Sequence, residues 1–236
     1  MTTLTDEAAA LGLRLTPEQE AAFDLYAREL AEWNTRVNLT AIVDPEGIRV
    51  RHFLDSLTVA KVAPMKAGTR VIDVGTGAGF PGLPLKMVFP DIHLTLLEAT
   101  GKKLNFLRHV CEVMGITAGV EFLHARAEEA GQMTGQRATY DVVVARAVAR
   151  LPILLEYLLP LAKIGGRCIA MKGSTAQAEA DDSGRALKTL GGKLAGIEAV
   201  QLPGVEETHH LVVVEKVAAT PGMYPRKPGV PTKNPL

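Results

Sequence analysis

The sequence predicts an α/β protein with a doubly wound, mostly parallel sheet and an N-terminal helical extension. From residue 70 onward, short β-branched runs alternate with helix-like stretches, and the runs are apolar on both faces, as expected of strands that helices cover on both sides. In the first 66 residues, apolar side chains instead recur at helical spacing. We therefore divide the chain into an extension (1–66), an α/β domain (67–217) and a basic, Pro-rich tail (218–236).

Two helix start signals organise the extension. Thr16 can cap a helix that begins at Pro17, and Asp44-Pro45 repeats the signal. An apolar stripe follows each start: Phe23, Tyr26, Leu30, Trp33 and Val37 after the first, and Val50, Phe53, Leu54 and Leu57 after the second. Each helix should therefore bury one face.

The α/β domain should contain six clear strands and one weak strand. We expect strands at 71–74, 93–99, 120–125, 140–147, 165–173 and 209–217, and helices at 82–89, 101–115, 150–163 and 174–190. A loop at 203–208 precedes the last strand, so that strand could pair antiparallel with the weak strand at 197–202. Five prolines should keep the tail extended or irregular.

Composition narrows the class of protein. The 236 residues are 47% hydrophobic and 22% charged, which is typical of a soluble globular protein. The sequence shows neither a membrane-length apolar run nor a secretory signal, so we expect a cytoplasmic protein. A net charge of zero argues against binding nucleic acid by bulk electrostatics alone. Cys111 and Cys168 lack metal-ligand spacing and should be buried packing residues.

The stretch RVIDVGTGAGFPGLPLKMVFP (70–90) places four glycines just after the first strand. In a doubly wound sheet this loop lies where ligands bind, and glycine lets the backbone approach a ligand closely. The register Gly77-x-Gly79-x-x-Gly82 matches the dinucleotide-binding pattern only formally. The register Asp73-x-Gly75-x-Gly77-x-Gly79 resembles the first motif of class I S-adenosylmethionine-dependent methyltransferases, whose cofactor has no phosphate to cradle.

Three later positions bear on the ligand. Glu98 ends the second strand, where a carboxylate can accept the ribose hydroxyls of either cofactor, although an exposed strand-end glutamate would look the same. Ala127-Glu128 follow the third strand, where class I methyltransferases contact adenine. Arg146 ends the fourth strand at the mouth of the cleft, or is a surface charge. No pair of side chains in the sequence has the pattern of a general base and a nucleophile. If the protein is a methyltransferase, the atom that accepts the methyl group should therefore need no activation.

Seven stretches together resemble the bacterial 16S ribosomal RNA guanine-N7 methyltransferases, long called glucose-inhibited division protein B. They are WNTRVNLTAI (33–42), RHFLDSL (51–57), VIDVGTGAGFPGLPLK (71–86), LEATGKKLNFL (97–107), ARAVA (145–149), MKG (171–173) and YPRKPGVPTKNPL (224–236). The resemblance implies the class I fold and methyl transfer from S-adenosylmethionine to N7 of a guanine in the 530 loop of 16S rRNA. We expect a monomer that acts on 16S rRNA or a precursor of the small subunit and binds no membrane.

The resemblance also implies roles for single residues. Gly75 and Phe80 line the cofactor loop with Asp73, Gly77 and Gly79; Glu98, Ala99 and Thr100 meet the ribose; Ala127 and Glu128 meet the adenine; and Arg146 closes the pocket. His52, Asp55 and Ser56 belong to the resemblance without an assigned role. We expect no metal.

Guanine N7 carries a lone pair and no proton, so the transfer requires no general base, and we expect no catalytic residue beyond those that place the reactants. RNA phosphates should meet a basic rim near the carboxyl edge of the sheet. Its expected members are Lys102, Lys103, Arg146, Arg150, Lys172, Arg226, Lys227 and Lys233. Each of them alone could equally be a solvated surface residue.

Three other functions remain open. A class I methyltransferase could act on another RNA or on a small molecule. An NAD-dependent oxidoreductase would use the Gly77 to Gly82 register and an acid such as His124 or Tyr140. A non-catalytic RNA-binding domain would not need the cofactor pocket.

Overall fold

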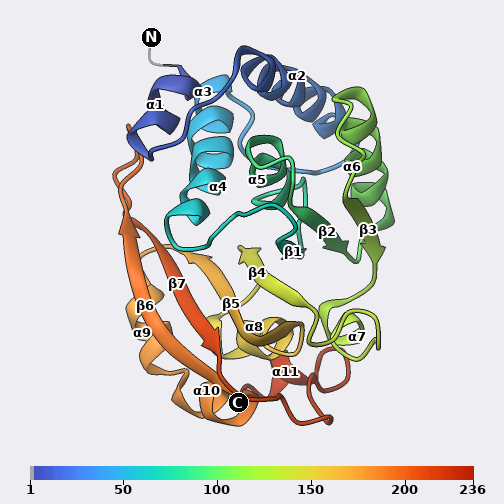
Figure 1. Cartoon of the computed structure of the whole chain (residues 1–236), viewed down its shortest axis with the longest axis vertical. Coiled ribbons are helices and arrows are strands. Elements are labelled where there is room, and N and C mark those ends of the chain that lie inside the picture. Colours follow the sequence, from blue (N-terminus) through green and yellow to red (C-terminus); the bar gives the residue numbers. More distant parts are fainter. Residues whose placement is uncertain (1–2) are drawn as a thin grey trace.

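The computed structural model of the chain describes residues 3–236 and has a seven-stranded sheet at its centre (Figure 1). The strand order is β3-β2-β1-β4-β5-β7-β6. Strands β1 to β5 pair in parallel, whereas β7 lies antiparallel to β5 and β6 antiparallel to β7. The doubly wound, mostly parallel sheet and the antiparallel pairing of its last two strands are therefore confirmed. Strand order reverses between β1 and β4, so ligands should bind beyond their carboxyl ends.

Six strands lie close to their predicted positions, whereas β6 begins at Gly192, five residues before the weak strand expected at 197–202. The strands are β1 (Arg70–Val74), β2 (His93–Glu98), β3 (Val120–His124), β4 (Tyr140–Arg146), β5 (Ala162–Lys172), β6 (Gly192–Val200) and β7 (His209–Lys216). The helices that cover the sheet are α5 (Gly82–Val88), α6 (Gly101–Val113), α8 (Leu151–Leu158), α9 (Ala176–Asp181) and α10 (Gly184–Leu190).

Two apolar cores lie on the two faces of the sheet. Successive strand residues point to opposite faces, so Val71 packs with the extension, α5 and α6, whereas Ile72 packs with α8, α9 and α10. Figure 1 shows these two groups of helices on opposite sides of the sheet. Cys111 and Cys168 are both buried, as predicted. In the described part of the chain, no helix is long and apolar enough to cross a membrane.

The extension forms a helical layer on the first core. It comprises α1 (Leu4–Ala10), α2 (Pro17–Asn34), α3 (Pro45–Gly47), the π-helical η1 (Ile48–Leu54), α4 (Asp55–Leu57) and the 3-10 helix η2 (Thr58–Lys61). Thr16 caps α2 as predicted, because its hydroxyl accepts the Gln19 N–H while the Gln19 side chain accepts the Thr16 N–H. Phe23, Tyr26 and Leu30 are the buried residues of α2.

Three predictions about the helices and the tail were wrong. The helix expected at 150–163 ends at Leu158, because Pro160 disfavours helix in the residue before it. The helix expected at 174–190 divides into α9 and α10 at Ser183, whose hydroxyl donates to the Glu179 carbonyl over 2.7 Å. The tail contains a short helix, α11 (Val230–Lys233), since proline is tolerated in a first helical turn. The short helix α7 (Ala127–Ala130) was not predicted from the sequence.

Candidate active site

The glycine loop after β1 adopts a backbone that favours glycine. Gly75, Gly77 and Gly79 have φ angles of 68°, 61° and 102°. A Cβ on Gly75 would lie 2.9 Å from Val148 Cγ2, and one on Gly79 would overlap the Tyr26 hydroxyl. The loop is therefore closely packed between the segment after β4 and helix α2 of the extension.

Asp73 supports this loop from within. It is fully buried, and its Oδ2 accepts hydrogen bonds from the Thr76 hydroxyl at 2.6 Å and from the Gly82 N–H at 2.8 Å. Among residues 3–236 nothing donates to its buried Oδ1. Burial raises the pKa of Asp73 from 3.8 to about 6, against the lowering effect of these two hydrogen bonds.

Asp73→Asn should stabilise the free protein above neutral pH. A carboxyl with a raised pKa binds its proton more tightly when folded, so the native state loses stability as pH rises toward 6. Raising the pKa from 3.8 to about 6 corresponds to about 3 kcal/mol of unfolding free energy. Denaturant unfolding at pH 8 should show a gain of about 2 to 3 kcal/mol, shrinking toward pH 4. The exposed Asp24→Asn serves as control, and a less stable Asp73→Asn protein at pH 8 would contradict this account.

A cavity of about 230 Å³ lies beyond the carboxyl ends of β1, β2 and β3, and we call it the Glu98 cavity. Of the residues predicted to bind cofactor, five line it: Gly75, Glu98, Ala99, Ala127 and Glu128. Leu97, Ala125 and Tyr157 add apolar wall. The Glu98 carboxylate is held by the Gly77 N–H at 3.1 Å and the Thr100 N–H at 2.8 Å.

The other predicted cofactor residues lie behind this wall. Thr100 and Gly77 position Glu98, while Asp73 and Gly79 hold the loop. Phe80 is buried, and its ring stacks on His52 with centroids 4.5 Å apart. Arg146 does not line the Glu98 cavity but faces the neighbouring one.

The tail forms part of the Glu98 cavity, which the sequence did not predict. Gly229 and Thr232 line it, and the Gly229 N–H donates to Glu128 Oε1 at 3.1 Å. Arg137 donates to the tail carbonyls of Thr220, Pro221 and Tyr224. No local pattern in the tail predicts these contacts, because each joins a tail residue to a residue more than 80 positions earlier in the chain.

A second cavity, of about 350 Å³, lies on the other side of the segment that follows β4, and we call it the Asp55 cavity. Arg146 and Ala147 line this cavity, whereas the next residue, Val148, lines the Glu98 cavity. Ala147 has a φ of 56°, a strained value for a residue other than glycine. Adjacent residues of the turn at Ala147 thus line the two cavities.

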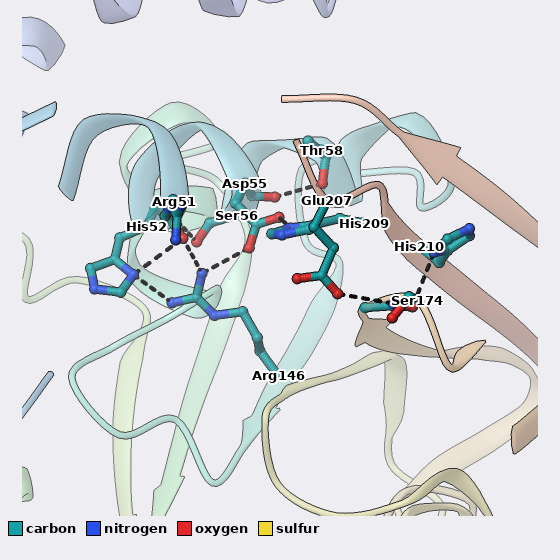
Figure 2. Close-up of polar contacts among 11 residues, drawn as sticks. Arg51, His52, Asp55, Ser56, Thr58, Arg146, Ser174, Glu207, His209 and His210 are labelled. Carbon is teal, nitrogen blue, oxygen red and sulfur yellow. Dashed lines mark hydrogen bonds and ion pairs between the residues drawn. The ribbon is translucent and has the colours of Figure 1, made fainter. Parts of the chain in front are cut away.

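Arg146 is the centre of a polar cluster in the Asp55 cavity (Figure 2). Its Nη1 donates to Asp55 Oδ2 and to the Arg51 carbonyl, both at 2.8 Å, and its Nη2 lies 3.2 Å from His52 Nδ1. The His209 Nδ1 lies 2.9 Å from Asp55 Oδ1. The buried Asp55 carboxylate therefore joins the extension to the end of β4 and the start of β7.

The two histidines of the cluster titrate in opposite directions. Burial, helped by the positive charge of Arg146, lowers the pKa of His52 to about 4, so His52 is neutral at pH 7. The hydrogen bond to Asp55 raises the pKa of His209 above its ordinary value. Neither His209 nor Glu207, which also lines the cavity, was identified from the sequence.

The predicted RNA-binding cations divide into two groups. Lys172 pairs with Glu179 at 2.8 Å, Arg226 pairs with the buried Glu156, and Arg146 pairs with Asp55. Arg150 makes only an exposed pair with Asp182, and Lys102, Lys227 and Lys233 are exposed, with Lys103 half-buried. The first group is thus tied to the fold, and the second faces solvent.

Comparison with known proteins identifies relatives along the whole chain. The family model described as "GidB: rRNA small subunit methyltransferase G" matches residues 19–212. The "Ribosomal RNA small subunit methyltransferase G" of Roseiflexus sp. (strain RS-1) is 49% identical over 100% of both chains. The protein of the same name from Desulforamulus reducens is 43% identical, covering 99% of this chain and 97% of its own.

Solved structures share the fold at low sequence identity. TYW2 of M. jannaschii in complex with AdoMet has a TM-score of 0.57 at 14% identity, with 75% of this chain and 80% of that chain covered. TrmN from Thermus thermophilus has a TM-score of 0.54 at 22% identity, with 72% and 53% covered. The predicted class I methyltransferase fold is therefore confirmed.

Proposed function

Because this chain belongs to the rRNA small subunit methyltransferase G family, we propose that it methylates N7 of a guanine in the 530 loop of 16S rRNA. S-adenosylmethionine is the proposed methyl donor. The observation that carries the proposal is the pair of cavities on either side of Ala147, one suited to the donor and one to the acceptor base. A dinucleotide oxidoreductase would leave the second cavity and its buried Asp55 cluster without a role.

The residues of the Glu98 cavity fit S-adenosylmethionine. Glu98 would accept the ribose hydroxyls, and Ala127 and Glu128 would meet the adenine beside the apolar wall. The close backbone at Gly75 suits a ligand that brings no phosphate. The buried, unpartnered Oδ1 of Asp73 supplies negative charge behind the loop, which favours a cationic ligand.

The chain's own residues would act by placement. When bound, S-adenosylmethionine supplies an electrophilic methyl group, and guanine N7, which has a lone pair and no proton, accepts it without a general base. His209 and Asp55 do have the geometry of a base and its orienting acid, with 2.9 Å between Nδ1 and Oδ1. In this proposal the pair holds Arg146 and the start of β7 in place and moves no proton.

RNA binding would use the solvent-facing cations. Lys102, Lys103, Arg150, Lys227 and Lys233 would contact phosphates, so affinity should fall with salt. Arg146, Lys172 and Arg226, although predicted to bind RNA, would contribute mainly by shaping the site, since each already pairs with a carboxylate.

The test is methylation of 16S rRNA, and of small subunits, from cells that lack this methyltransferase. We expect one N7-methylguanine per 16S rRNA, in the 530 loop, detected by cleavage at the methylated base. Calorimetry should show binding of S-adenosylhomocysteine and none of NAD. A methyl group on another atom or another RNA would support the alternative that the protein is a class I methyltransferase with a different substrate.

The same assay tests the placement mechanism through His209. His209→Asn should keep most of the turnover at saturating substrate, with a pH profile of rate that stays flat above pH 7, because no proton is removed. Loss of turnover with both binding affinities intact would make His209 a general base instead.

A further inference from the structure

We propose that the Asp55 cavity holds the acceptor guanine and that Glu207 determines specificity by accepting hydrogen bonds from its N1–H and N2–H2 groups. This assignment rests on the proposed function, which it deepens. It follows from the charges of the cavity, the position of Glu207 and the chemistry of the guanine edge.

Of the carboxylates that line the Asp55 cavity, Glu207 has no ion pair within the described residues. Its two permanent cations, Arg146 and Lys172, are paired with Asp55 and Glu179 at 2.8 Å each. Glu207 lines the same cavity, and residues 3–236 offer it no ion pair. Three carboxylates thus face two permanent cations and His209, and His209 pairs with Asp55 rather than with Glu207. A carboxylate without an ion pair disfavours a phosphate in the cavity and favours a group that donates hydrogen bonds.

The exposed Glu207 side chain is anchored to the segment after β5 (Figure 2). Its Oε1 accepts the Ser174 N–H at 3.1 Å, beyond the end of β5. A Cβ on Gly173 would lie 2.5 Å from that oxygen, so the glycine of the MKG stretch makes room for it. His210 Nδ1 lies 3.1 Å from the Gly173 carbonyl, which fixes the same turn. Among residues 3–236 nothing donates to Oε2, and Oε1 keeps a second lone pair, so both oxygens can accept hydrogen bonds from a ligand.

Guanine matches this carboxylate. Its Watson–Crick edge presents two adjacent donors, N1–H and N2–H2, on the side of the base away from N7. A base that faces the Glu98 cavity with N7 would turn these donors to the opposite side, into the Asp55 cavity, whose lining includes Glu207. Adenine presents an acceptor, N1, at that edge and would be repelled. After methylation the ring is positively charged, which a nearby carboxylate also stabilises.

The experiment compares small subunits reconstituted with 16S rRNA carrying guanine or inosine, which lacks the 2-amino group, at the methylated position. The wild-type enzyme should prefer guanine by about tenfold in kcat/KM. Glu207→Gln should lose about ten- to a hundredfold on guanine and much less on inosine, so that the preference approaches one. Glu207→Asp keeps the charge and should retain part of the preference. Glu206, the adjacent residue, is exposed like Glu207 but does not line the Asp55 cavity, so Glu206→Gln is the matched control and should behave as wild type.

Binding of S-adenosylhomocysteine by each variant shows whether the fold and the Glu98 cavity survive, and we expect no change. An unaltered guanine preference in Glu207→Gln, or an equal loss on guanine and inosine, would overturn the role of Glu207 and leave the proposed function standing. Absence of N7-methylguanine with the wild-type enzyme would overturn the proposed function, and this assignment with it.

Discussion

Arg226→Ala is expected to lower the free energy of unfolding by about 3 to 5 kcal/mol, because it leaves a buried charge without its partner. The Glu156 side chain is only 1% exposed. It accepts the backbone N–H of residue 226 at 2.8 Å, Arg226 Nε at 2.9 Å and Arg226 Nη2 at 2.6 Å. The same change should loosen the tail, including Gly229 and Thr232, and so weaken binding of S-adenosylhomocysteine.

Two further variants give this result its controls. Glu156→Gln in the Arg226→Ala background should recover part of the stability, since it removes the uncompensated charge. Lys227→Ala, at the adjacent exposed position, should leave unfolding unchanged and reduce the salt dependence of RNA binding by about one phosphate contact. A loss below 1 kcal/mol in Arg226→Ala, measured by urea unfolding, would show that the tail does not depend on this pair.

Arg146→Ala should be the most damaging change in the Asp55 cavity. The Arg146 side chain is 17% exposed and Asp55 only 4%, so the pair is largely shielded from water. Because His209 remains to neutralise Asp55, we expect a loss near the low end of the range for broken buried pairs, about 3 kcal/mol. The guanidinium also lies 5.1 Å from the Phe80 ring centroid, so the glycine loop should shift and turnover should fall.

The pH dependence of this variant distinguishes the pair from simple packing. His209 has a raised pKa, so its charged contact with Asp55 stabilises the protein fully below 6.5 and is lost as pH rises through the folded pKa. Without Arg146, the charged His209 is the remaining cation beside Asp55, so its contact contributes more to stability. Arg146→Ala should therefore lose more stability at pH 8, where His209 is less charged, than at pH 6. Arg150→Ala, an exposed arginine four residues on, should change stability by less than about 1 kcal/mol at either pH. A loss that is the same at both pH values would attribute the effect to packing.

Much of the site could be predicted because its determinants are local. The alternation of β-branched runs and helical stretches encodes the strands, and the parallel order then places Gly75, Glu98 and Glu128 at one edge. The register Asp73-x-Gly75-x-Gly77-x-Gly79 carries its own geometry, since all three glycines need positive φ.

Tertiary structure alone decided which charged groups face solvent and which are paired. Asp55 and His209 are 154 residues apart, and Glu156 and Arg226 are 70 apart, so neither pairing leaves a periodic signal in the sequence. The same holds for Glu207, which reaches the Asp55 cavity only because β7 lies beside β5. Local patterns report the burial of one face of an element, whereas an ion pair depends on which elements the fold brings together. The sequence by itself thus determined the sheet, the glycine loop and the ligand edge, and the fold decided that the tail and the extension complete the two cavities.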